Sequence, residues 1–240
     1  MVRIIDLETT GTDPETDAII EIASVDLTHD LTLANPMRTF VDPGRLIPPH
    51  VSGVHHIVDE DVAGAPDLAA AVEPFRGADV YAAHNADFER AFMAANGIDL
   101  GPTQHGEPPA WICTWKCALR LWGDWPAHNN QALRYQLGLV RPFGYDREAI
   151  HPHRADSDVI VTAAILAEMS KLAPWGDLVR WSAKPALHTR LAFGKHRGER
   201  YDAVPADYLD WLADGRHDLP QDVRASARYW LEQRTGAAAA

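Results

Sequence analysis

The sequence predicts an α/β domain with a mixed β-sheet, followed by a small C-terminal α+β module. Three strand-like segments come first and are separated by short turns, which favours an antiparallel start to the sheet. Strand-like and helix-like segments then alternate, as they do where helices connect parallel strands. Six basic residues and a single acid, Glu199, lie between residues 180 and 200, so the character of the chain changes near Trp175. We therefore expect a domain over residues 1–174, a module over 175–235 and a tail over 236–240.

The composition is that of a soluble protein, with 46% hydrophobic and 23% charged residues. No apolar run approaches the roughly 20 residues that a membrane span needs, and Asp6 and Glu8 interrupt any N-terminal signal segment. Two cysteines, Cys113 and Cys117, fit a reduced chain better than a disulfide framework or a zinc site. We therefore expect a cytoplasmic protein with no membrane partner. A net charge of −12 argues against nucleic-acid binding over the whole surface, but not against binding through metal ions and a local basic patch.

The expected strands are short and apolar. Residues 2–5 form a largely β-branched run that is typical of a buried strand, and residues 9–11 end it. A loop is expected to open at Pro48 and to run through His56. The later strands are expected over 18–27, 39–41, 80–83 and 111–113.

Helices are expected where apolar residues recur at helical spacing or where capping residues stand. Apolar or small residues at alternating four- and three-residue intervals within 155–169 define one buried helical face, and Pro174 ends that helix. Gly97 stands where the residue after a helix commonly adopts a left-handed conformation. The expected helices are 67–75, 86–96, 114–121, 130–137 and 155–172. In the C-terminal module, 193–198 is predicted as a glycine turn between two short strands, followed by helices over 208–212 and 223–231.

Two acids, Asp6 and Glu8, end the first strand one residue apart. Alternate residues of a strand point to the same face, so both carboxylates project together from a strand that is otherwise buried. Two adjacent buried carboxylates are costly unless a cation neutralises them. On this stretch alone, an exposed strand end with two solvated acids is an equally good interpretation.

Two further acidic segments favour the cation. The segment 84–89, His-Asn-Ala-Asp-Phe-Glu, lies at a strand-to-helix junction, and the segment 153–158, His-Arg-Ala-Asp-Ser-Asp, leads into the last helix of the domain. Hard cations such as Mg²⁺ and Mn²⁺ prefer carboxylate oxygens. Two such ions about 3.5–4 Å apart can clamp a phosphodiester. Carboxylates from separate elements therefore suggest a two-metal site.

A histidine accompanies the last acidic segment. His153 lies five residues before Asp158, too far round a helix to share a face with it. We expect His153 on the loop before the helix, able to swing over the site. A histidine can exchange a proton near neutral pH, so it can take one from the attacking water. His151 is a competing candidate for this role.

The three motifs resemble the pattern of the DEDDh 3′–5′ exonucleases, the DnaQ-like group with an RNase H fold. That pattern is Asp-x-Glu after a first strand, His-Asn-Ala-x-Phe-acid in the middle and His-x₄-Asp late, and the resemblance covers about residues 2–172. The segments 111–114 and 193–198 resemble one member of the family in particular. The resemblance implies an RNase H-like mixed five-stranded sheet flanked by helices, two Mg²⁺ or Mn²⁺ ions, and release of nucleoside monophosphates from single- or double-stranded DNA 3′ ends.

The resemblance also implies roles for single residues. Metal binding falls to Asp6, Glu8, Glu89 and Asp158, and catalysis to His153 as general base together with Glu8. Substrate contacts are expected from Leu7, Thr9, His84, Asn85, Lys195 and Arg197. Two alternatives stay open, because His84 and Asn85 are also suited to fixing the backbone at a helix start, and a basic run is often a solvated face.

One position departs from the family pattern, because Glu89 stands where the family usually has aspartate. The longer side chain would shift a metal ion by about an ångström, and a misplacement of that size can cost on the order of 10²-fold in rate. Asp87 is the alternative ligand, although residues i and i+2 of a helix point in different directions. We favour Glu89.

The sequence therefore favours a metal-dependent 3′–5′ exodeoxyribonuclease. An exoribonuclease on the same scaffold stays open, because no residue indicates how a 2′-hydroxyl group is treated. A non-catalytic nucleic-acid-binding module, in which Glu89 marks a decayed site, is a third hypothesis.

Overall fold

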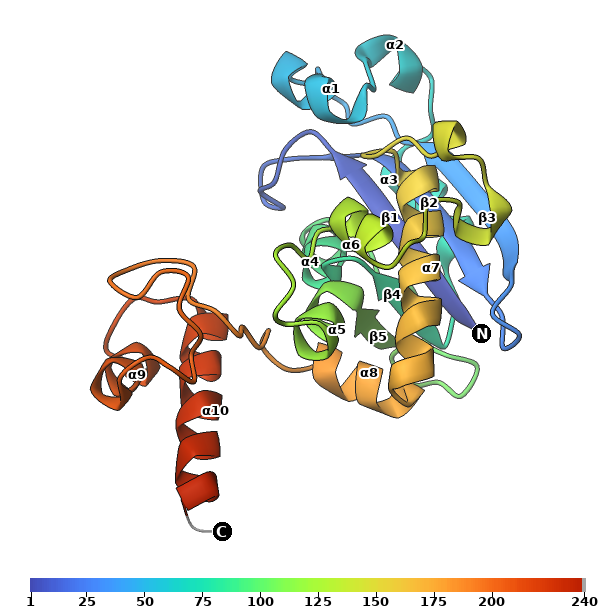
Figure 1. Cartoon of the computed structure of the whole chain (residues 1–240). Coiled ribbons are helices and arrows are strands. Elements are labelled where there is room, and N and C mark those ends of the chain that lie inside the picture. Colours follow the sequence, from blue (N-terminus) through green and yellow to red (C-terminus); the bar gives the residue numbers. More distant parts are fainter. Residues whose placement is uncertain (239–240) are drawn as a thin grey trace.

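The computed structural model describes residues 1–238, and within that range five strands form one mixed sheet in the order β3-β2-β1-β4-β5 (Figure 1). β2 pairs antiparallel with both β1 and β3, whereas β4 is parallel to β1 and β5. The predicted antiparallel start and mixed sheet are therefore confirmed. The strands are β1 (Val2–Thr9), β2 (Ile19–Leu27), β3 (Leu33–Phe40), β4 (Val80–Ala83) and β5 (Ala110–Cys113).

Helices cover both faces of the sheet. Val2 and Ile4 of β1 pack in one core with α5, α6, α7 and α8, and Ile5 and Leu7 pack in a second core with α3 and α4. The alternation of β1 therefore directs Asp6 and Glu8 to the face that α7 covers. The helices are α1 (Pro49–His55), α2 (Asp59–Val62), α3 (Leu68–Val72), α4 (Ala86–Ala95), α5 (Thr114–Leu121), α6 (Asn130–Gln136), α7 (Ala155–Leu172), α8 (Trp175–Ser182), α9 (Ala206–Ala213) and α10 (Gln221–Ala238).

Two segments near the N-terminus differ from the prediction. The loop expected from Pro48 contains α1, because Pro49 occupies the first helical position, where a proline favours a helix. The strand expected over 39–41 begins instead at Leu33. Asn35 has a φ of 48° and the pairing register shifts near this point, so a bulge hides the strand in the sequence. Pro36 is tolerated because β3 is the edge strand.

The C-terminal region is more helical than predicted. Gly194 and Gly198 have φ values of 76° and 85°, as expected of a glycine turn. The prediction of two short strands around this turn is wrong. In this part of the described chain, Arg190 and Arg200 form only an isolated bridge. Figure 1 shows α9 and α10 side by side, and they share a small core of Leu191, Tyr201, Val204, Leu209, Leu212, Val223 and Ala227.

The domain boundaries stay a prediction. Helix α8, just beyond residue 174, packs on β5 and α5. Helix α10 runs to Ala238, and residues 239–240 of the predicted tail lie outside the described residues. Among residues 1–238, no single helix is long and apolar enough to cross a membrane, and α7 and α8 reach that length and composition only as a pair bent by 115°.

Candidate active site

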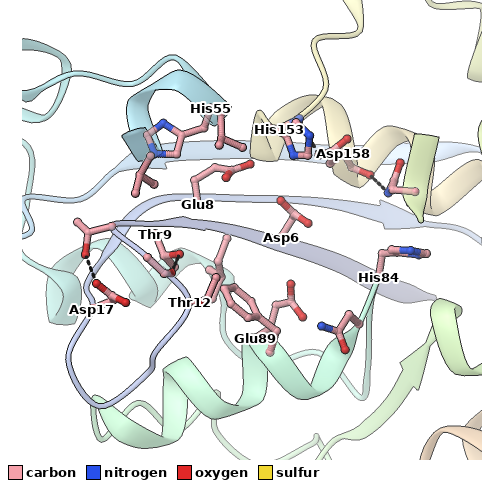
Figure 2. Close-up of a pocket in the computed structure, with 18 of the residues that line it drawn as sticks. Asp6, Glu8, Thr9, Thr12, Asp17, His55, His84, Glu89, His153 and Asp158 are labelled. Atoms are coloured by element: carbon pink, nitrogen blue, oxygen red, sulfur yellow. Dashed lines mark hydrogen bonds between the residues drawn. The ribbon is translucent and has the colours of Figure 1, made fainter. Parts of the chain in front are cut away.

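A cavity of about 730 Å³ opens beside the end of β1. Figure 2 shows side chains from β1, α1, α4 and α7 around it. The predicted site residues that line the cavity are Asp6, Leu7, Glu8, Thr9, His84, Asn85, Glu89, His153 and Asp158. Lys195 and Arg197 are not among its lining residues, nor are Asp87 and His151. The structure therefore brings all three sequence motifs to one place.

Three carboxylates form the centre of the cavity. Asp6, Glu8 and Asp158 each offer one oxygen, and these oxygens all lie within 4.8 Å of one another. Burial, followed by the charges of Asp158 and Glu8, raises the pKa of Asp6 well above its usual range. Burial, followed by the charges of Asp158 and Glu21, raises the pKa of Glu8 to about 8. Charging these three close carboxylates is costly without a cation. Their oxygens also lie close enough together to bind one divalent metal ion.

Asp158 is held in place by two hydrogen bonds. Its Oδ2 accepts one from the backbone N–H of His153 at 3.0 Å, and its Oδ1 accepts one from Gln131 Nε2 at 3.0 Å. Burial raises the pKa of Asp158 to about 6, while the His153 N–H acts in the opposite direction. Both oxygens are thus oriented before any ion arrives.

Glu89 reaches the cavity from the first turns of α4. It is 3% exposed, and its Oε2 has no hydrogen-bond partner. Burial, and then the charge of Glu8, raises the pKa of Glu89 well above its usual range. Figure 2 shows its carboxyl group on the side that faces Asp6. A buried carboxylate oxygen without a donor is what a fourth metal ligand requires.

His153 lies in the turn that precedes α7, which confirms its predicted place outside the helix. Its φ of 60° is a left-handed conformation that residues with a side chain rarely adopt. The hydrogen bond from its N–H to Asp158 helps to hold this conformation. Figure 2 shows its ring beside Asp158 and on the same side of β1 as Glu8.

His84 and Asn85 connect β4 to α4. His84 Nδ1 lies 2.9 Å from Thr114 Oγ1, and burial lowers the pKa of His84 to about 4. Asn85 has a φ of 72° at the residue before the helix. Both residues line the cavity, and His84 contacts the start of α5 through Thr114. The Asn85 side chain forms no hydrogen bond that caps α4, so the alternative role of fixing this helix start has no side-chain contact behind it.

Sequence reasoning missed three residues. Gln131 holds Asp158, but nothing in the sequence of its helix indicates that this amide faces an acid. His55 ends α1 and lines the cavity, and it fell in a segment that we expected to be a loop. Glu21 lies on β2 directly opposite Glu8 and is fully buried. The sequence could have indicated Glu21 as a buried acid, because it is a single acid within the apolar run Ile-Ile-Glu-Ile.

Comparison with known proteins identifies relatives along nearly the whole chain. The family described as Exonuclease (RNase_T) matches residues 4–166. Exodeoxyribonuclease 10 of Escherichia coli K12 is 34% identical over 239 residues, which cover 97% of this chain and 99% of that protein. A DNA polymerase III subunit epsilon-like protein of Rhodobacter capsulatus is 32% identical over 166 residues, covering 67% of this chain and 22% of that protein.

Solved structures show the same fold. Exonuclease X in complex with 5′ overhanging duplex DNA aligns with a TM-score of 0.62 and 33% identity, covering 76% of this chain and 99% of that chain. Escherichia coli exonuclease I with a dA16 oligonucleotide aligns with a TM-score of 0.55 and 18% identity, covering 75% of this chain and 42% of that chain, which supports the fold alone. The RNase H-like fold and the resemblance to exodeoxyribonuclease X, inferred from the motifs and from 111–114 and 193–198, are confirmed.

Proposed function

The chain belongs to the exonuclease family, and on this basis we propose that it releases nucleoside monophosphates from DNA 3′ ends by metal-dependent hydrolysis. The observation that carries the proposal is the group of Asp6, Glu8 and Asp158 oxygens within 4.8 Å of one another. The 34% identity to exodeoxyribonuclease 10 and the DNA bound in the exonuclease X structure support DNA as the substrate.

We assign two Mg²⁺ or Mn²⁺ ions to Asp6, Glu8 and Asp158, with Glu89 as the fourth carboxylate. All four donors are carboxylates, the ligand type that these hard cations prefer. The unpartnered Oε2 of Glu89 and the raised pKa values of the group support the assignment. The bound ions would supply the positive charge that stabilises the phosphate in the transition state.

We assign general-base catalysis to His153, which would accept the proton of the attacking water. Its place in a turn beside Asp158 supports this role. Leu7, Thr9, His84 and Asn85 line the same cavity and are proposed to contact the terminal nucleotide. His84 would act there as a neutral group, because its pKa is lowered to about 4.

We assign a contact with the DNA backbone to Lys195 and Arg197 in the C-terminal region. Both side chains are exposed and, within residues 1–238, neither forms an ion pair. Their neighbours Arg190 and Arg200, in contrast, both pair with Asp124. Residues 180–240 hold ten of the 22 Lys and Arg residues but eight of the 34 Asp and Glu residues. This part of an acidic chain is therefore the part suited to phosphate groups.

The test uses purified protein, Mg²⁺ and matched oligonucleotides of DNA and RNA labelled at either end. We expect labelled mononucleotides from the 3′-labelled DNA first, and none from the Asp6→Ala variant. Absence of release at several pH values, or release that begins at the 5′ end, would contradict the proposal. Preferred cleavage of the RNA would replace it with an exoribonuclease, and DNA binding without turnover would replace it with a binding module.

A further inference from the structure

Glu21 is a buried acid that neighbours the group of Asp6, Glu8 and Asp158 but does not belong to it. It stands opposite Glu8 in the β1–β2 pairing, and its side chain is 0% exposed. Arg38 of β3 donates to its Oε1, and Arg154 Nη2 donates to the same oxygen at 3.0 Å. Two guanidinium groups therefore neutralise this buried carboxylate, so it does not need a metal ion.

The second oxygen of Glu21 holds the start of α7. Its Oε2 accepts hydrogen bonds from the backbone N–H of Ala155 at 3.0 Å and from Arg154 Nε at 3.3 Å. Ala155 is the first residue of α7, and its N–H has no partner within the helix. A single side chain on β2 thus fixes both the last residue of the turn and the first residue of the helix, 134 positions away in the sequence.

This contact bears directly on His153. His153 is the residue before Arg154, and its left-handed backbone is held on one side by the bond from its N–H to Asp158. The bonds that Glu21 accepts from Arg154 and Ala155 hold the other side of the same turn. Without them the turn would keep the bond from the His153 N–H to Asp158 and the bond from the His151 N–H to Ser157 Oγ at 3.1 Å, but Arg154 and Ala155 would lose their anchor on β2. A φ of 60° is unfavourable for a histidine.

We infer that Glu21 is a positioning residue, which places His153 over the reaction centre by fixing Arg154 and Ala155. It binds no metal, because four donors already occupy its two oxygens. The inference rests on the proposed role of His153 as the general base.

The central test is Glu21→Gln, which keeps the shape of the side chain and replaces an accepting oxygen with a donating amide. We expect kcat to fall by about 10²-fold, the cost of a catalytic group displaced by about an ångström. The KM for DNA and the affinity for Mn²⁺ stay unchanged. In a His153→Ala background, Glu21→Gln causes no further loss, because residues that act through one group are not additive.

Two further variants guard against a general loss of structure. Arg154→Ala changes a side chain that is 22% exposed, and it is expected to behave like Glu21→Gln in both backgrounds. Asp26→Asn is the matched control, because Asp26 is also buried on β2 and paired with an arginine, Arg3, but lies at the other end of the strand. This control should lower the unfolding temperature and leave kcat unchanged.

Three outcomes would overturn the inference. Losses that multiply when Glu21→Gln and His153→Ala are combined would show that Glu21 acts by another route. Recovery of the Glu21→Gln rate at saturating Mn²⁺ would show that it acts through the metal ions. A wild-type rate for His153→Ala would remove the proposed base and the inference together, whereas the first two outcomes leave the base in place.

Discussion

The ammonium nitrogen of Lys116 lies 2.6 Å from Asp87 Oδ2. Lys116 belongs to α5 and its side chain is 8% exposed, so it holds the Asp87 carboxylate beside α5 and outside the cavity. Glu89, two residues further along α4, lines the cavity with an oxygen that has no donor. The helix thus separates the two acids, as the difference in direction between positions i and i+2 requires.

This relationship predicts different effects for the two acids. Glu89→Gln should lower the rate by about 10²-fold and weaken Mn²⁺ binding, because a ligand of the proposed metal site is lost. Asp87→Asn, the matched control, should leave both near wild type. Initial rates over a range of Mn²⁺ concentrations measure both quantities. An active Glu89→Gln beside an inactive Asp87→Asn would transfer the ligand role to Asp87.

The proposed base leads to a second prediction. His153→Ala should lower the single-turnover rate by about 10²–10⁴-fold, the usual contribution of general-base catalysis. His151→Ala should have little effect, because His151 does not line the cavity. Single-turnover cleavage of a 3′-labelled oligonucleotide measures the chemical step free of product release. Equal losses in the two variants would point to the turn as a whole rather than to the His153 ring.

Local patterns in the sequence were enough to place the single acidic segments on their strand or helix, whereas their meeting at one metal site was expected from the family resemblance. The two-residue period of β1 places Asp6 and Glu8 on one face, and the start of α7 was predicted at the correct residue, so Asp158 was placed in its first turn. Both features depend on neighbours within a few positions. The five-residue offset likewise placed His153 outside the helix.

Features that depend on distant partners were not predictable in this way. The bonds from Arg154 and Ala155 to Glu21 join residues 133 and 134 positions apart, and the Gln131–Asp158 bond joins residues 27 apart. The spacing of apolar residues along the sequence does not indicate such a long-range pairing. The β3 bulge also escaped detection, because an Asn-Pro pair normally indicates a turn and only its place at the sheet edge keeps it in a strand.

The crowded carboxylates predict a pH-dependent stability in the metal-free protein. The pKa of Glu8 rises from 4.5 to about 8 on folding, so the folded state favours its neutral form. The contribution of Glu8 to the free energy of unfolding is therefore fully present below pH 4.5 and is lost as the pH rises through about 8. His84, whose pKa falls to about 4, acts in the opposite direction, but only below its unfolded value of 6.5.

The measurement is thermal unfolding in a chelator between about pH 7 and 9, where the histidine contribution is constant. The unfolding temperature of the wild type should fall over this range, and that of Glu8→Gln should fall less. Added Mg²⁺ should raise the unfolding temperature of the wild type more than that of the variant, since ligands stabilise the state that binds them. A wild-type unfolding temperature that rises with pH would contradict the raised pKa of Glu8.

The unpaired cations of the C-terminal region lead to a prediction about DNA affinity rather than chemistry. A lysine or arginine that neutralises one phosphate contributes about 0.7 to the salt slope of binding to a single strand. Lys195→Ala combined with Arg197→Ala should therefore weaken binding and flatten the slope by about 1.4. The kcat at saturating DNA should stay unchanged, because neither side chain lines the cavity.

Arg216→Ala is the control for this prediction. Arg216 is 87% exposed, like a free surface cation, but its guanidinium group is already bound to Asp214. Its removal should leave the slope nearly unaltered, because its charge is compensated before DNA binds. If the double variant also keeps the wild-type slope in titrations at several salt concentrations, Lys195 and Arg197 form a solvated face. The nuclease cavity would then bind DNA without help from this region.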